Sequence, residues 1–149
     1  MKTIIAVILT LALVCSASAM DQMTIGIFKV LGEPTPDTQE MILKDKDTSE
    51  TLHVDRNIQL SDRDFKSLSL VDGDEISILI TLTGEGAKKF AELTKSSIGK
   101  RVAIVADNQV LSAPVVRQEI SGDSIQITGN LSREVAEKII ALFQTAKKS

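Results

Sequence analysis

The sequence predicts an α+β domain in which a mostly antiparallel sheet has two main helices packed on one face. Short segments of alternating apolar and polar residues are joined by tight-turn dipeptides, and strands joined in this way pair antiparallel. Two longer segments place apolar residues at helical spacing. The segments follow in the order strand hairpin, helix, strand hairpin, strand and helix, which is typical of a two-layer α+β fold.

Residues 1–19 are typical of a secretory signal peptide. Lys2 precedes an uncharged apolar stretch that is shorter than the ~20 residues of a membrane span, and small residues follow up to Ala19. We therefore expect cleavage between Ala19 and Met20 and a periplasmic or secreted chain. The alternative is a lipoprotein signal that retains Cys15 as a lipid anchor. Val14 disfavours it, because such sites usually have a small residue before the cysteine.

Residues 20–45 are interpreted as an N-terminal strand and a Pro-containing loop, ahead of the main domain at 46–149. Residues 24–30 favour the strand. Pro34 and Pro36 lack a backbone donor, so the chain around them is expected to form a loop and not part of a strand ladder.

A strand at 51–54 and a capped helical turn at 61–65 are expected before the first hairpin. Asp72 and Gly73 stand between two alternating segments and predict a type I′ turn, which needs positive φ at both residues. The residues expected to share the core face of the second strand are Ile76, Ile78, Ile80 and Leu82.

Residues 83–99 predict the first helix. Thr83 is the expected N-cap, Gly86 allows a tight entry from the strand, and Gly99 is the expected left-handed residue at the end. The apolar stripe at helical spacing consists of Ala87, Phe90, Ala91, Thr94 and Ile98. The residues expected on the solvent side are Lys88, Lys89, Glu92 and Lys95.

The second hairpin is expected at 101–116, with Asp107 and Asn108 as its turn, since both tolerate positive φ. Pro114 must lie at an edge, a bulge or a strand start. Two short strands are expected at 115–120 and 125–130, the second ending at the turn residue Gly129. Ser132 is the expected cap of the final helix, whose apolar stripe consists of Val135, Ile139, Leu142, Phe143 and Ala146.

The composition excludes several classes of protein. The chain has 17 basic and 20 acidic residues, and its basic residues form no cluster. Nucleic-acid binding is therefore not expected, because it depends on grouped Lys and Arg. The single cysteine, Cys15, lies in the predicted signal peptide, so no disulfide is expected in the exported chain. No later apolar run is long enough for a transmembrane segment in the mature chain.

Two short motifs match those of known catalytic or phosphate-binding sites, but a structural role explains each of them better. Ser97 and Lys100 match the S-x-x-K nucleophile motif, but this pair ends a helix and Gly99 interrupts its geometry. The glycines at 84 and 86 lack the rest of a phosphate-binding loop and are explained by the tight entry into the helix.

Metal and modification motifs are similarly weak. His53 is the sole histidine and has no cysteine to join it as a ligand, so a strand histidine is the favoured interpretation. The paired aspartates lack the terminal glutamate of a calcium loop. Asn130 begins a glycosylation sequon, and it is equally explained as a turn residue. We expect no catalytic residues, no metal and no cofactor.

A series of short matches between residues 81 and 139 is shared with a known family. The matching positions are 85–90, 94, 99–101, 103–105, 112–114 and 127–130. On these residues the chain resembles the head subdomain of the first periplasmic domain of SecD and SecDF, the accessory subunit of the bacterial Sec protein-export channel. It departs from the family at Asn108 and at Asp123, where glycine is usual.

The resemblance implies a periplasmic module of the kind thought to touch exported polypeptide, without enzymatic activity. The base subdomain and the transmembrane helices of the family are not visible in the sequence, so proton-driven pulling is not expected. We expect a non-enzymatic binding module that engages exported polypeptide or an envelope protein partner. The alternatives are a structural or regulatory partner of the Sec translocase and, disfavoured by the lack of a catalytic set, a hydrolase.

The expected binding site is an unpaired strand edge. The chain has no Trp or Tyr and only four Phe, so an aromatic groove is not expected. An edge beside Pro114 offers main-chain hydrogen bonds to an extended peptide with little sequence preference. The candidate contact residues are Val110, Pro114, Val115 and Val116.

Overall fold

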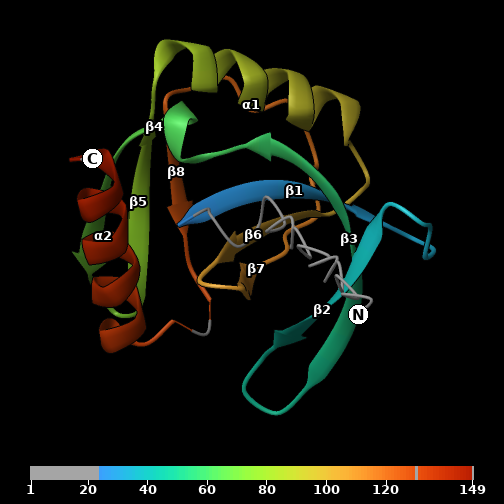
Figure 1. Ribbon diagram of the computed structural model, residues 1–149, viewed down its shortest axis with the longest axis horizontal. Helices are drawn as coiled ribbons and strands as arrows, with labels where there is room; N and C mark the ends of the chain where they lie inside the picture. Colours follow the sequence, from blue (N-terminus) through green and yellow to red (C-terminus); the bar gives the residue numbers. More distant parts are fainter. Residues whose placement is uncertain (1–23, 130, 149) are drawn as a thin grey trace, which may run out of the picture.

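The computed structural model describes residues 24–129 and 131–148 (Figure 1). The elements before the first long helix are β1 (Ile25–Leu31), β2 (Thr38–Lys44), β3 (Ser49–Leu60), the 3-10 helix η2 (Asp62–Asp64), β4 (Phe65–Asp72) and β5 (Ile76–Leu82). The remaining elements are α1 (Gly84–Ser96), β6 (Val102–Ala106), β7 (Gln109–Ser112), β8 (Ser124–Ile127) and α2 (Arg133–Lys147). The predicted signal peptide, its cleavage site and Asn130 of the sequon lie outside the described residues.

Five strands form sheet A in the order β2-β3-β1-β6-β7, and every neighbouring pair is antiparallel. β1 lies centrally, between β3 and β6. The β6–β7 hairpin turns at Asp107 and Asn108, whose φ angles are 51° and 59°. Short polar side chains of this kind tolerate the left-handed region, which is why a two-residue turn forms here without glycine.

Three strands form sheet B in the order β4-β5-β8, again antiparallel. β4 and β5 form the expected hairpin, but the type I′ turn predicted at Asp72 and Gly73 is wrong. Asp72 pairs with Ile76, so residues 73–75 form the loop, and neither Asp72 nor Gly73 has a positive φ. A longer loop reverses the chain without the left-handed conformations that a two-residue turn needs.

The main core lies between the two sheets and the two helices. β5 contributes Ile78, Ile80 and Leu82 to it, as its alternation predicts. A second core lies on the other face of sheet A and includes Phe28, Met41, Leu52, Val54, Ala103, Val105, Val110 and Ala113. Because successive side chains of a strand point to opposite faces, β1 and β6 supply both cores and are buried on both sides.

α1 begins as the sequence predicts, with the Thr83 hydroxyl accepting a hydrogen bond from the Gly86 amide at 3.0 Å. Its buried residues are Gly86, Phe90, Leu93 and Thr94. The burial predicted for Ile98 is wrong, since this side chain is 53% exposed. The helix ends at Ser96, so helical spacing no longer places Ile98 on the buried face.

α2 also begins at its predicted cap, where the Ser132 hydroxyl accepts from the Val135 amide at 3.2 Å. Its buried residues are Ala136, Ile139 and Phe143. Leu142 and Ala146, which were expected in the stripe, are exposed. α2 lies beside β4 and β5 (Figure 1).

Both helices pack onto the main core, and the strands are antiparallel throughout, so the domain is α+β. Figure 1 shows α1 lying across one end of the two sheets. In the part of the chain that the structure describes, no helix combines the length and the apolar character that a membrane crossing requires.

Candidate functional site

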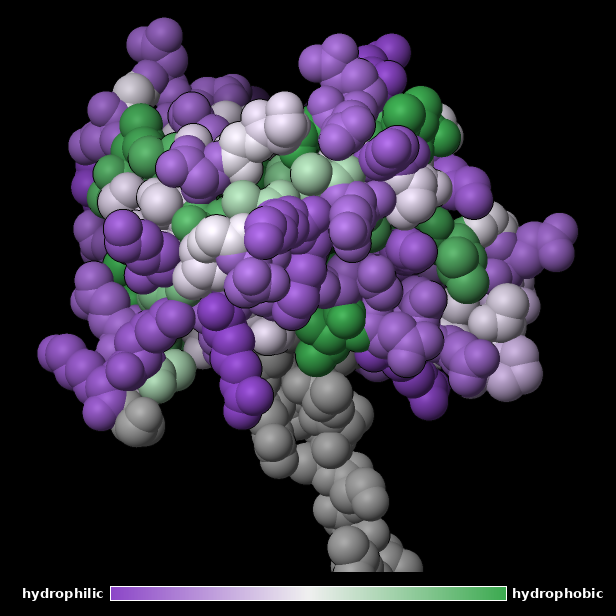
Figure 2. Space-filling view, turned by 90° about the horizontal axis from the view of Figure 1, so that it is seen from above, coloured by the Kyte–Doolittle hydropathy of each residue, from purple (hydrophilic) through white to green (hydrophobic). Residues whose placement is uncertain are grey.

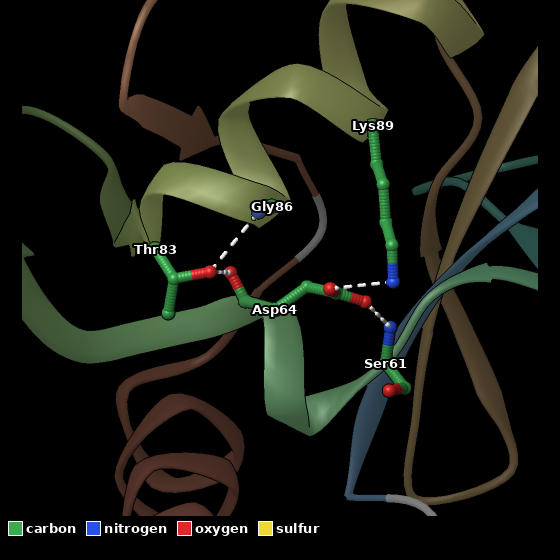
Figure 3. A network of polar contacts seen from close by, with 5 residues as sticks. All are labelled: Ser61, Asp64, Thr83, Gly86 and Lys89. Carbon is green, nitrogen blue, oxygen red and sulfur yellow. Dashed lines mark hydrogen bonds and ion pairs between the residues drawn. The ribbon is translucent and has the colours of Figure 1, made fainter.

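A buried aspartate positions the N-terminus of α1 (Figure 3). Asp64, in η2, accepts hydrogen bonds from the Ser61 amide at 3.0 Å and from Lys89 Nζ at 2.9 Å. The Asp64 carbonyl oxygen accepts from the Thr83 amide at 2.9 Å. A Cβ on Gly86 would lie only 2.1 Å from this carbonyl oxygen, so the first turn of α1 can approach η2 this closely only with glycine.

The segment that follows β7 is not the strand predicted at 115–120. It runs back along the end of α1 and the start of β6, with Val115 and Arg101 forming an isolated bridge. Pro114 accepts through its carbonyl from the Val102 amide at 3.1 Å, and the Val116 amide donates to the Lys100 carbonyl at 2.8 Å. These bonds use the backbone groups that a separate strand ladder would need.

One buried hydroxyl ties the rest of this segment to α1. The Ile120 amide donates to Thr94 Oγ1 at 2.9 Å, and Thr94 is fully buried. The same hydroxyl donates within its own helix, to the Phe90 carbonyl at 2.9 Å. Thr94 therefore holds residue 120 against the last turn of α1.

These elements enclose a cavity of about 590 Å³, here called the β8 groove. Its walls are residues 125–128, residues 114–118 and Ile120, Phe90 and Thr94 of α1, Ser112, and the main-core side chains Ile27, Val102 and Ile104. The volume lies within the range of known ligand sites, and the walls are mainly apolar. The groove therefore lies between β8, at the edge of sheet B, and the side chains of β1 and β6 in sheet A.

The four predicted contact residues have different positions. Val110 and Val116 are buried, with 8% and 4% of their surface exposed, and belong to different cores. Pro114 and Val115 are exposed and line the groove. Of the four, only this pair is placed to contact a partner without rearrangement of a core.

Sequence reasoning missed the opposite wall of the groove. β8 was expected only as a strand, and Ile120 was assigned to a strand that does not form. Ile120 is 42% exposed and Val115 is 48% exposed, and both side chains line the groove. Figure 2, seen from the α1 side, shows that this face is mainly hydrophilic, with apolar side chains in small separate areas.

Residues singled out for possible chemistry do not converge. His53 lies half-buried in β3, and with Arg101 and Glu50 it lines a different cavity of about 580 Å³. Its Nδ1 atom is buried and has no hydrogen-bond partner among the described residues. Ser97 is buried at the C-cap of α1. Within residues 24–129 and 131–148, no three His, Cys, Asp or Glu side chains come together as metal ligands.

The pKa values of two residues on α2, Lys138 and Arg133, are raised, and neither residue lines the groove. A hydrogen bond from Lys138 to Asp107, 2.8 Å long, raises the pKa of this lysine, and the charge of the carboxylate adds to the effect. The hydrogen bond and the charge of Asp72 raise the pKa of Arg133 in the same way. Both pairs connect α2 to a β-hairpin, one in each sheet.

Comparison with known proteins finds one family. The family model of the SecDF P1 head subdomain matches residues 39–147. Protein translocase subunit SecD of Aquifex aeolicus is 38% identical over 114 residues, which are 74% of this chain and 22% of that protein. Protein translocase subunit SecDF of Thermus thermophilus is 47% identical over 68 residues, which are 46% of this chain and 9% of that protein. The chain thus spans less than a quarter of the length of either relative.

Solved structures give the same relationship. A crystal structure of SecDF in a super-membrane-facing form matches with a TM-score of 0.63 and 26% identity, over 83% of this chain and 19% of that one. A structure described as a membrane component SecDF that enhances protein export matches with a TM-score of 0.61 and 25% identity, over 88% of this chain and 70% of that one.

Proposed function

The chain belongs to the SecDF P1 head subdomain family, and from this premise we propose that it is a non-enzymatic periplasmic module that binds exported polypeptide in the β8 groove. The relatives are named as subunits of the protein translocase, which supports a role in protein export with the Sec machinery. The periplasmic location rests on the predicted signal peptide. Sequencing of the mature N-terminus tests it, with Met20 expected and Cys15 contradicting soluble export.

One observation supports the groove as the site. It is a mainly apolar cavity, and two large aliphatic side chains, Val115 and Ile120, remain exposed at it. Exposed aliphatic surface beside a cavity favours contact with apolar side chains of a partner. An unfolded polypeptide presents such side chains along its whole length, whereas a folded protein has most of them buried.

The lining of the groove supports binding more than bond cleavage. Among the described residues that line it, Arg117 alone has a charged side chain. A guanidinium has hydrogen-bond donors and no acceptor, so it cannot take up a proton as a general base. Affinity for unfolded polypeptide is expected to be weak, on the order of 10 μM or poorer, because the client must be ordered on binding.

Fluorescence anisotropy with a labelled, carboxymethylated secretory protein, which stays unfolded, tests this proposal. The Ile120→Asp variant places a charge at the groove and is expected to weaken binding about tenfold or more. Ile42→Asp is the matched control, because Ile42 is also an exposed isoleucine but lies on β2 and does not line the groove. Equal binding by the wild type and the Ile120→Asp variant would contradict the proposed site.

The relatives are named as subunits of the protein translocase, and this favours a second candidate function. In this alternative the module is a structural or regulatory partner of the Sec translocase, and its ligand is a folded envelope protein. Affinity capture from periplasm and membranes separates the two. Many unrelated exported chains favour client binding, whereas one stoichiometric partner favours the alternative.

A further inference from the structure

We propose that the bound polypeptide adds to sheet B as a new strand, pairing its main chain with the free edge of β8. This inference rests on the proposed function and names the form in which the client is recognised. Among the strands that the structure describes, β8 is the last of sheet B and pairs with β5 on one side only. Its other side faces the β8 groove, to which residues 125–128 contribute one wall.

The register shows which backbone groups of β8 are free. The Leu82 amide donates to the Asp123 carbonyl, and these residues continue the register in which Thr81 lies opposite Ser124. In an antiparallel pair, directly opposed residues alternate between hydrogen-bonded and non-hydrogen-bonded positions. Residues 125 and 127 therefore bond to β5, whereas Ser124 and Gln126 direct their amide and carbonyl groups toward the free edge.

Side chains of the added strand would alternate in the same way. Ile125 and Ile127 point from β8 toward the main core and line the groove. A client residue directly opposite either of them would place its side chain on this same face, within reach of the apolar walls. Its neighbours in the client would point to the opposite face of sheet B, where β8 carries Ser124 and Gln126. The site therefore selects extended segments with an apolar residue at every second position.

The charge at the groove adds a preference. Arg117 lines the groove, is exposed, and has no ion-pair or hydrogen-bond partner within the described part of the chain. A carboxylate on the client would supply that partner, and Arg pairs with carboxylates through two parallel hydrogen bonds. The occupant is thus an extended segment that carries an acidic residue close to its alternating apolar residues.

The test uses a pair of variants at one position. In Gln126→Pro the free amide is lost, but no bond to β5 is lost, because the amide of residue 126 points away from β5. In Gln126→Ala the amide remains, and both variants equally lose the side-chain bond from Gln126 to Ser77 Oγ. The probe is a short, capped, unstructured peptide of alternating Val and Thr with one Glu. We expect Gln126→Ala to bind it like the wild type and Gln126→Pro to bind it about tenfold more weakly.

A second measurement keeps the test decisive if Gln126→Pro does not fold. The probe peptide is N-methylated at single positions, and each version is titrated into the wild-type protein. In the added strand, the amides of every second peptide residue face β8, and we expect methylation at these positions to abolish binding. Methylation at the alternate positions, whose amides point away from β8, is expected to be tolerated. A probe with Gln in place of Glu is expected to bind the wild type severalfold more weakly than the Glu probe does. The Arg117→Ala variant is expected to bind the two probes with equal affinity.

The outcomes separate this inference from the proposed function. Binding in the groove that is indifferent to N-methylation and to Gln126→Pro would overturn the added-strand mode and leave the binding function intact. If neither the peptide nor a permanently unfolded protein bound to the wild type, both would be overturned. Equal affinity for the Glu and Gln probes would overturn the role of Arg117 alone.

Discussion

Lys89 Nζ lies 2.9 Å from Asp64 Oδ1, and the two side chains differ sharply in exposure: the carboxylate is buried and the lysine is about half exposed. The pair joins α1 to η2, two elements that are separated in the chain by all of β4 and β5. The sequence had suggested that Lys89 only faces solvent. Its ammonium group instead neutralises a buried charge at the point where α1 enters the fold (Figure 3).

Replacing Lys89 with Ala is therefore expected to destabilise the domain by about 1 to 2 kcal/mol, because Asp64 would keep a buried charge without its partner. The partial exposure of the lysine keeps this figure below that of a fully buried pair. Lys88→Ala is the control, since Lys88 is exposed and its ion pair, within the described residues, is with the exposed Glu85. Urea denaturation compares the variants, and equal stabilities would show that the Asp64 contact contributes nothing.

Gly86→Ala is expected to cost about 2 to 4 kcal/mol, because its Cβ would collide with the backbone carbonyl of Asp64 and push α1 away from η2. Gly84→Ala is the matched control in the same helical turn. A Cβ at Gly84 meets nothing within 4 Å, so this change is expected to be neutral or slightly stabilising. If thermal melts showed the two variants to be alike, the close approach at Gly86 would be absent in solution.

Phe90→Ala is expected to cost roughly 3 to 5 kcal/mol, because this ring is buried in the main core. The same ring lines the β8 groove, so the variant is also expected to enlarge the groove and lower polypeptide affinity. Ile98→Ala serves as the control because Ile98 is exposed. Calorimetry that ranked Ile98→Ala as the more damaging change would mean that the buried face of α1 is misassigned.

The pairing of Lys138 with Asp107 makes stability depend on alkaline pH. The hydrogen bond and the charge of Asp107 raise the pKa of Lys138 above its ordinary 10.5, so this stabilisation is complete below 10.5 and is lost as pH rises through the folded-state pKa. Between neutral pH and pH of about 11, the melting temperature of Lys138→Gln is expected to fall by less than that of the wild type. Lys95→Gln, which changes an exposed lysine of α1, should follow the wild-type curve. Coinciding curves for all three proteins would count against the Lys138 pairing.

The sequence predicts best those features that depend on neighbouring residues. The caps at Thr83 and Ser132 and the starts of both helices follow from local hydrogen-bonding chemistry. The turn at Asp107 and Asn108 depends on two residues that tolerate positive φ. The α+β class follows from the order of such segments.

Features that depend on distant residues could not be predicted in this way. Alternation in β4, β5 and β8 does not show that they form a sheet separate from the other strands, because pairing between strands is non-local. Residues 115–120 have the composition of a strand, yet their backbone bonds go to residues 99 and 100 and to Thr94. The β8 groove has walls from five parts of the chain between Ile27 and Thr128, so no short motif indicates it.

The central claim is that unfolded polypeptide binds in the β8 groove, and an NMR titration of the isotope-labelled protein with a carboxymethylated secretory protein tests it most directly. The account predicts that amide shifts concentrate in residues 114–128 and near Phe90 and Thr94, with the amides of Ser124 and Gln126 gaining protection from hydrogen exchange. Shifts confined to the β2–β3 hairpin and the cavity beside His53, or no shifts at millimolar polypeptide, would contradict it.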